Sequence, residues 1–97
     1  MGRPRQSASA TEKKDDTITA VSRAFAVLRA FQSGDSHLGN GEIAQRTGLP
    51  KATVSRLTST LTSLGYLSYS PSYEKYALGT GIWALGNAFR RSNSVVA

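Results

Sequence analysis

Two helical patterns separated by a glycine constrain the fold of this chain more than any other feature. Residues 51–64 place their large apolar side chains on one side of a helix, at about 100° per residue. These side chains are Val54, Leu57, Leu61 and Leu64. A shorter pattern over residues 41–47 centres on Ile43 and Ala44, and Gly48 suits the left-handed backbone that ends a helix. The two patterns predict a pair of helices joined by a tight turn.

The opposite side of residues 51–64 is small and polar. Its members are Ala52, Ser55, Arg56, Ser59 and Ser63. Exposed helix faces normally carry Glu, Lys and Gln, which favour the helix more than serine does. Short hydroxyl side chains let a helix approach another surface closely, and they can hydrogen-bond to phosphate oxygens or base edges. This face therefore predicts contact with nucleic acid, with an ordinary solvent-exposed polar face as the alternative.

The chain before these helices divides into an arm, a longer helix and a loop. Residues 1–16 have no apolar periodicity, which predicts a disordered basic arm. An amphipathic helix follows and ends near Gly34, and the side chains predicted for its buried face are Ile18, Val21, Ala24, Phe25, Leu28 and Phe31. A second apolar edge of this helix consists of Ala20, Val27 and Ala30. In the loop, Leu38 is expected to tuck under the fold and Asn40 to cap the next helix.

After Gly65 the pattern changes to two short aromatic strands. Residues 66–69 and 73–78 flank Ser70-Pro71-Ser72, which predicts a β-hairpin. A last amphipathic helix follows Gly79, and we assign its Ile82, Trp83 and Phe89 to core or dimer contacts. The predicted fold is mostly helical with a small hairpin: a winged helix-turn-helix over residues 17–79, then a linker helix and tail over residues 80–97.

The composition excludes several classes of function. The 97 residues include no cysteine and one histidine, His37, so a metal or thiol site lacks ligands and no cofactor is expected. Ser55 or Ser59 lacks an imidazole base for nucleophilic catalysis, because His37 belongs to a separate loop. Apolar runs of only a few residues exclude a membrane span, which favours a soluble cytoplasmic protein without membrane contact. We therefore do not expect an enzyme.

The charge favours a polyanionic partner. The chain carries 12 basic and 6 acidic side chains, a net charge of +6. Residues 17–97 contribute eight of the basic and three of the acidic side chains, so most of the excess lies in the part expected to fold. Nucleic acid fits better than a membrane, because no basic amphipathic surface helix stands out. A charge that only maintains solubility is the alternative.

The helices and the hairpin also carry a resemblance to a known family. Residues 42–57 read EIAQRTGLPKATVSRL and resemble the helix-turn-helix of the IclR family of bacterial transcription regulators. Leu64-Gly65-Tyr66-Leu67 resembles the end of that family's third helix, and Tyr76-Ala77-Leu78-Gly79 resembles the end of its wing. Together these segments cover about half of the chain. Leu38-Gly39-Asn40-Gly41 departs from the family pattern and indicates a looser entry into the second helix.

The resemblance implies a sequence-specific regulator of transcription, a repressor or an activator. Its third helix would read the major groove of a palindromic operator in double-stranded DNA. The residues expected at base edges are Ala52, Thr53, Ser55, Arg56 and Ser59, and Arg56 is the strongest candidate. Lys51 is expected to bind phosphate, and so is Lys75 in the tip of the wing over residues 72–75. Ser22 and Arg23 of the first long helix are expected near the DNA backbone.

Three further expectations concern partners. Gly2-Arg3-Pro4-Arg5 resembles part of an AT-hook, which predicts that Arg3 and Arg5 enter a minor groove, with a solubilising tail as the alternative. A palindromic site predicts a homodimer, formed through the first long helix and the C-terminal helix. The resemblance also implies a further C-terminal domain that binds a small-molecule effector. Because residues 80–97 hold only a linker helix and tail, we expect this chain to be a fragment, the DNA-binding domain without that effector domain, with a stand-alone DNA reader as the alternative.

A winged-helix module that binds protein instead of DNA is the alternative function. Such a module predicts an apolar or acidic outer face on residues 51–64. The outer face read from the sequence is neither, which favours DNA.

Overall fold

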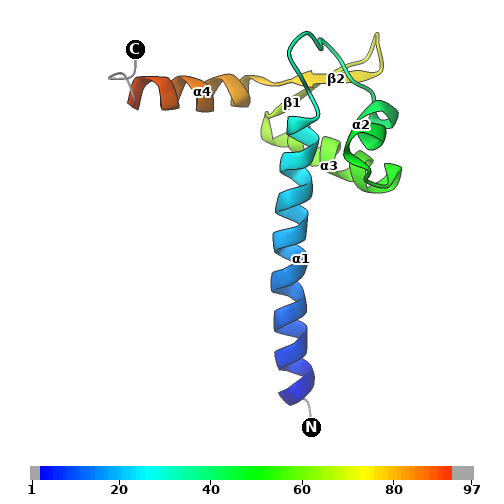
Figure 1. Cartoon of the computed structure of the whole chain (residues 1–97), viewed down its shortest axis with the longest axis vertical. Coiled ribbons are helices and arrows are strands. Elements are labelled where there is room, and N and C mark those ends of the chain that lie inside the picture. Colours follow the sequence, from blue (N-terminus) through cyan, green and yellow to red (C-terminus); the bar gives the residue numbers. More distant parts are fainter. Residues whose placement is uncertain (1–2, 93–97) are drawn as a thin grey trace.

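Four helices and one β-hairpin make up the part of the chain that the structure describes. The structure is a computed structural model that describes residues 3–92, with side chains from residue 16 onward. The elements are α1 (Arg3–Arg29), α2 (Asn40–Thr47), α3 (Lys51–Leu64), β1 (Leu67–Ser70), β2 (Lys75–Leu78) and α4 (Thr80–Ser92). The C-terminal end of α1, α2, α3 and the hairpin form the body, from which the rest of α1 and α4 project in different directions (Figure 1). The predicted winged helix-turn-helix with a linker helix is confirmed.

Apolar side chains from α1, α2, α3 and β1 meet in one core. Its buried members are Val27, Ala30, Leu38, Ile43, Val54, Leu61 and Leu67. Each large aliphatic side chain that leaves water in this way contributes about 1.5–3 kcal/mol. The core positions predicted for Val54 and Leu61 are confirmed, and Leu38 lies beneath the fold as predicted. The core fixes α3 with its apolar side inward and leaves the other side free.

The buried face predicted for α1 is wrong over most of its length. Ile18, Val21 and Phe25 are 57%, 51% and 57% exposed, whereas Val27 and Ala30 of the second predicted edge lie in the core. Position along the helix explains Ile18 and Val21, because the earlier turns of α1 project beyond α2 and α3 (Figure 1). Phe25 lies in the packed part of α1 but on another side of it, where it lines the groove between α1, α3 and α4. The members of the predicted face that do pack against the core are Ala24, Leu28 and Phe31.

Leu64 also departs from its predicted core position. Its side chain is 64% exposed at the C-terminal end of α3, and Thr58 is buried instead. At about 100° per residue, Thr58 points about 40° to one side of Val54 and Leu61 about 20° to the other, so the buried face of α3 includes position 58 and not position 64. The last turn of α3 extends beyond the core, and Leu64 lines the groove between α3, α1 and α4.

Helix α1 begins at Arg3, where the sequence predicts a disordered arm over residues 1–16. The structure instead describes residues 3–16 as the first turns of α1, and residues 1–2 lie outside the described part. Pro4 falls in the first helical turn, where its missing N–H has no partner to lose, and no glycine or further proline follows it within α1. Extending a helix is far easier than nucleating one, so α1 continues outward from its packed end. Neither α1 nor any other described helix combines the length and apolarity of a membrane span.

Each of the two central helices ends at a glycine, and α2 also begins after one. Gly48 and Gly65 adopt left-handed φ angles of 76° and 90°, which confirms their predicted role after α2 and α3. Asn40 is not the cap of α2, as predicted, but its first helical residue. Glu42 performs the capping, because its Oε1 accepts a hydrogen bond of 2.8 Å from the Gly39 N–H. The carboxylate can reach this N–H because it lies one helical turn further along.

The hairpin pairs β1 with β2 in antiparallel register, with Leu67 opposite Leu78 and Tyr69 opposite Tyr76. β1 has the predicted length but is shifted by one residue, and β2 is two residues shorter than predicted. Residues 71–74 form the turn, in which Glu74 has a φ of 55°. The loop before α2 pairs with β2 as a third backbone segment, because Leu38 and Tyr76 exchange two backbone hydrogen bonds of 2.8 Å. The wing is therefore tied to the entry of the helix-turn-helix.

The direction in which α4 leaves the body is fixed by a close approach of two backbone segments. The N–H groups of Gly79 and Gly81 donate hydrogen bonds of 2.9 Å to the carbonyls of Tyr66 and Gly65, respectively. A Cβ atom on Gly79 would lie 2.5 Å from the Gly65 oxygen, and one on Gly81 would lie 2.9 Å from the same oxygen. Only glycine fits at these positions without movement of the backbone.

Candidate nucleic-acid interface

The outer face of α3 is open to solvent and carries no acidic side chain. The predicted contact residues that lie fully exposed on it are Lys51, Ala52, Ser55, Arg56 and Ser59. Thr53 is half-buried at the edge of this face. Within the described part of the chain, none of the polar side chains in this exposed group makes a hydrogen bond or ion pair. Their donors and acceptors are therefore available to an external partner.

The N-terminal turn of α3 adds unpartnered backbone donors to this face. Pro50 precedes the helix, and no side chain caps the turn. The first N–H groups of a helix lack partners within the helix and form the positive end of its dipole. Lys51 stands in the same turn, so charge and backbone both favour an anion such as a phosphate group at this end of α3.

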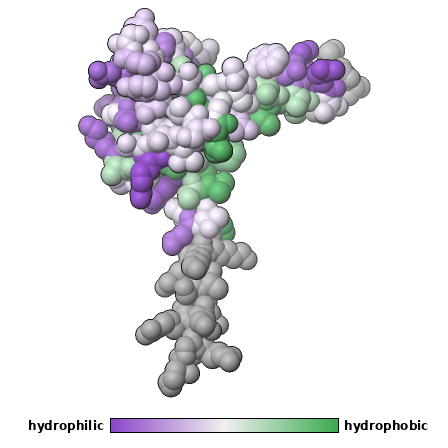
Figure 2. All heavy atoms as spheres, turned by 180° about the vertical axis from the view of Figure 1, so that it is seen from behind, coloured by the Kyte–Doolittle hydropathy of each residue, from purple (hydrophilic) through white to green (hydrophobic). Residues whose placement is uncertain are grey.

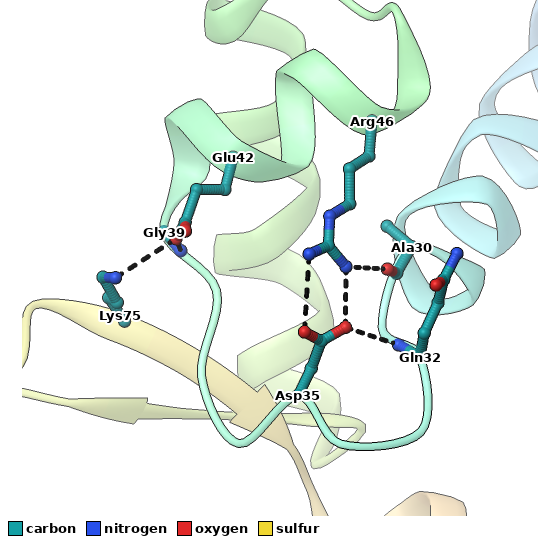
Figure 3. Close-up of polar contacts among 7 residues, drawn as sticks. All are labelled: Ala30, Gln32, Asp35, Gly39, Glu42, Arg46 and Lys75. Carbon is teal, nitrogen blue, oxygen red and sulfur yellow. Dashed lines mark hydrogen bonds and ion pairs between the residues drawn. The ribbon is translucent and has the colours of Figure 1, made fainter.

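Arg46 contrasts with the free Arg56. Its guanidinium lies 2.6 Å from Asp35 Oδ2 and donates a further hydrogen bond of 2.9 Å to the Ala30 carbonyl (Figure 3). The hydrogen bond from Arg46, and then the one from the Gln32 N–H, hold the pKa of Asp35 below its usual value. Arg46 thus joins the end of α1 to α2 and the loop between them. The sequence gives no signal for this pair, whose members lie 11 residues apart and meet only in the folded chain.

Lys75 is also engaged within the fold. Its Nζ lies 3.3 Å from Glu42 Oε1, the same oxygen that accepts the Gly39 N–H (Figure 3). These two interactions, the backbone hydrogen bond first, hold the pKa of Glu42 below its usual value. Lys75 opens β2 and does not lie in the turn itself, where Glu74 supplies the charge. The wing tip is therefore less basic than the sequence predicts.

The predicted contact residues of α1 are not brought together with α3. Ser22 and Arg23 are exposed on α1, and Ser22 lines an open groove of about 950 Å³ between α1 and the end of α2. Arg3 and Arg5 belong to the first turns of α1, at the end that points away from the body (Figure 1). Their side chains lie outside the described residues. The candidate interface is therefore centred on α3.

A sequence model of the IclR helix-turn-helix domain matches residues 20–71, which is more than half of the chain. The chain belongs to the IclR family. The matched segment runs from the middle of α1 to the wing, and includes the whole outer face of α3. The resemblance drawn from the sequence and the expected winged helix-turn-helix DNA-binding domain are confirmed.

Individual relatives agree with this assignment to the IclR family. The HTH-type transcriptional regulator TsaQ1/TsaQ2 of Comamonas testosteroni is 43% identical over 74 residues, which are 76% of this chain and 26% of that protein. The structure of an IclR family transcriptional regulator from Brucella abortus matches with a TM-score of 0.69 and 52% identity, over 73% of this chain and 27% of that one. This chain thus spans about a quarter of the length of these relatives.

A third comparison extends the fold match to a more distant protein. The structure of the IclR transcriptional regulator from Alicyclobacillus acidocaldarius matches with a TM-score of 0.67 and 31% identity, over 71% of this chain and 28% of that one. All three of these relatives are named as regulators of transcription, which agrees with the expectation that this IclR chain is not an enzyme.

Proposed function

We propose that this IclR domain binds double-stranded DNA in a sequence-specific manner, as the DNA-reading part of a cytoplasmic regulator of transcription. The observation that carries the proposal is the outer face of α3, which is exposed, cationic and free of partners within the described fold. A module that docks on protein would favour an apolar or acidic helix, and α3 has neither on this side. DNA is therefore the partner that matches the chemistry of the face.

In this proposal α3 lies in the major groove with its N-terminal half against the bases. Arg56 donates a bidentate pair of hydrogen bonds to a guanine, and Lys51 binds phosphate together with the first N–H groups of α3. Ala52 allows the close approach. The remaining base contacts come from Thr53, Ser55 and Ser59.

Contacts outside α3 belong to the same proposal but have weaker support. Ser22 and Arg23 would approach the DNA backbone from α1, while Lys75 would reach phosphate only by sharing or leaving Glu42. Arg3 and Arg5 would enter a minor groove only if the first turns of α1 come near the duplex. Deleting residues 2–14 tests this last contact: an unchanged affinity at low salt removes the arm from the interface.

Selection of preferred duplexes from a random pool tests the proposed function. We expect an enriched palindromic sequence, and an affinity for it that falls steeply with salt concentration in a gel-shift series. The protein-docking alternative predicts no shift of any duplex below about 100 μM protein. That result would overturn the proposal.

We propose further that a second copy of the chain covers the apolar surface of α1 and α4. This surface is defined by Ile18, Val21, Phe25, Leu64, Trp83, Leu85 and Phe89, all exposed. Trp83, Leu85 and Phe89 are 71%, 59% and 68% exposed, and α4 buries no residue. Figure 2 shows hydrophobic residues along α4 and where α1 joins the body. Apolar area of this extent normally marks an interface.

A second copy is the occupant that the proposed DNA site favours, because a palindrome has a two-fold axis and its reader needs the same axis. The groove of about 300 Å³ between α1, α3 and α4 gives an apolar side chain of that copy a place to insert. Sedimentation of the chain at micromolar concentration tests the dimer. A small-molecule effector, where the regulator uses one, would act through a further domain beyond α4.

A further inference from the structure

Thr58 breaks the chemical pattern of the core. It is the one polar side chain among the buried residues of the described chain, at 0% exposure, and it lies between Val54 and Leu61 on the inner face of α3. An apolar side chain at this position would continue the stripe. A buried hydroxyl is tolerated only where it is hydrogen-bonded.

The hydroxyl is bonded both within its own helix and to the neighbouring one. Thr58 Oγ1 lies 3.1 Å from the Ser55 carbonyl and 2.9 Å from Oδ1 of Asn40, 18 residues away in the sequence. The bond to Ser55 would satisfy the hydroxyl by itself, as the bond of Thr62 Oγ1 to the Thr58 carbonyl does at 2.7 Å. The contact with Asn40 therefore does more than satisfy a buried group.

The contact with Asn40 joins α3 to α2. Asn40 is the first residue of α2, and among the described residues this is the one hydrogen bond between side chains of the two helices. The chain itself connects the two helices through the turn at Gly48, at the other end of α2 from Asn40. Packing between Ile43 and Val54 is apolar, and such packing does not specify a direction. The hydrogen bond adds a directional restraint on how α3 is rotated against α2.

Rotation of α3 decides which side chains face outward. Thr58 stands in the chain between Arg56 and Ser59, whose side chains are exposed on the outer face, while its own hydroxyl proton is shared between Asn40 Oδ1 and the Ser55 carbonyl. A small rotation of the helix would move Arg56 and Ser59 relative to the bases. Base contacts depend on hydrogen-bond geometry, whereas contacts of a lysine with phosphate are more tolerant.

We propose that Asn40 and Thr58 are positioning residues that fix the rotation of α3 and thereby set the base preference of the domain. The proposal rests on the proposed DNA-binding function. It assigns a purpose to Leu38-Gly39-Asn40-Gly41, the segment in which the sequence departs from the family pattern. Within this segment Asn40 supplies the acceptor for the Thr58 hydroxyl.

The test measures, for the full chain, the ratio of affinities for the selected duplex and for a scrambled duplex of the same length. Thr58→Val removes the hydroxyl and keeps the shape, while Thr58→Ser keeps the hydroxyl. We expect Thr58→Val to lower the ratio about three- to tenfold, as expected for one lost hydrogen bond. Affinity for the scrambled duplex and its salt dependence should not change. Thr58→Ser should retain the ratio within about twofold.

Asn40→Ala provides a second variant at a position that is only half-buried. It should cause the same loss as Thr58→Val, and the double variant should lose no more than either single variant, because both remove one interaction. Additive losses, an unchanged ratio in a folded Thr58→Val chain, or an equal fall in affinity for both duplexes would each overturn the positioning role. If the unaltered chain prefers no duplex, the proposed function itself fails, and this inference fails with it.

Discussion

The outer face of α3 and the apolar surface of α1 and α4 are both exposed, yet they differ in every chemical respect. The first has hydroxyl groups, a guanidinium and an ammonium, none of them engaged within the described fold. The second has aromatic and aliphatic side chains that are each more than half exposed. Water is a good partner for the first surface and a poor one for the second. Exposure alone therefore identifies neither function, and the side-chain chemistry separates them.

The two surfaces also differ in how they are held. The face of α3 rests on the core through Val54, Thr58 and Leu61, so its shape is set before any partner binds. Helix α4 has no buried residue and depends on the joint at Gly79 and Gly81 for its direction. A preformed face suits recognition of bases, which requires accurate geometry. An uncovered helix gains its stability when a partner arrives.

The largest effect is expected from a charge on the apolar surface. Trp83→Glu should prevent dimerisation, because it would place a carboxylate in an interface without a counter-charge. Affinity for a palindromic duplex should fall at least about 100-fold, since two linked half-sites are then bound separately. Affinity for a duplex with one half-site should not change. Sedimentation and titration of both duplexes measure these effects.

Tyr69→Gln is the matched control, because it removes an exposed aromatic side chain from the hairpin and leaves α1 and α4 intact. It should leave the sedimentation coefficient unchanged. A Trp83→Glu chain that still sediments as a dimer would show that the apolar surface is not the seam.

The second largest effect is expected from Arg56 on the outer face of α3. Arg56→Ala should lower discrimination at one base position of each half-site by about 1–3 kcal/mol, or roughly 5- to 150-fold, because it removes a bidentate contact. The melting temperature should stay the same, since Arg56 has no partner in the described fold. Arg46→Ala is the control with the opposite pattern: it should lower the melting temperature and leave base preference intact. A preference unchanged in Arg56→Ala would remove Arg56 from base reading.

These two arginines also show what the sequence can and cannot predict. The stripe of Val54 and Leu61 and the turns at Gly48 and Gly65 follow from local periodicity and backbone conformation, which the sequence contains directly. Whether an arginine is free or paired depends on contacts between distant segments. Arg46 meets Asp35 only because the loop folds back under α2, so its role could not be predicted.

Helix α1 illustrates the same limit for apolar residues. Its apolar side chains satisfy helical periodicity for two overlapping faces, one with Phe25 and one with Val27. The choice between the faces is made by where α2 and α3 dock, which is not a local property. Three residues assigned to the buried face, Ile18, Val21 and Phe25, are therefore exposed, while Val27 and Ala30 of the second apolar edge lie in the core.

The close backbone contact of Gly79 and Gly81 with Gly65, which directs α4, can be altered without changing a residue of either surface. Gly79→Ala should destabilise the domain by about 1–3 kcal/mol, because a Cβ atom 2.5 Å from the Gly65 oxygen forces the backbone apart. Gly86→Ala, in the middle of α4 with open space around it, should instead stabilise the helix by up to about 1 kcal/mol. Thermal unfolding of both variants measures the difference. Equal melting temperatures would show that the joint tolerates a side chain.

A smaller effect separates the two lysines near the proposed DNA. Lys51→Ala should weaken binding to all duplexes alike and reduce the slope of log affinity against log salt by about one. Lys75→Ala should reduce the slope by less, because Glu42 already neutralises part of its charge. Titrations at four or more salt concentrations give both slopes. A larger change for Lys75 would mean that the ion pair opens on DNA and that the wing contributes a full phosphate contact.

The smallest effect is a dependence of stability on pH that belongs to the internal polar contacts and not to the face of α3. Arg46 holds the pKa of Asp35 below its usual 3.8, so the stabilising contribution of Asp35 is present above about pH 3.8 and is lost as the pH falls through the lowered value. Asp35→Asn should therefore lower the melting temperature at pH 7, and the difference should shrink as the pH falls below 3.8. Arg56→Ala should show no difference at either pH, since no carboxylate faces it in the described fold. A melting-temperature difference for Asp35→Asn that stays constant from pH 7 to pH 2 would show that the contact with Arg46 does not stabilise the charged carboxylate.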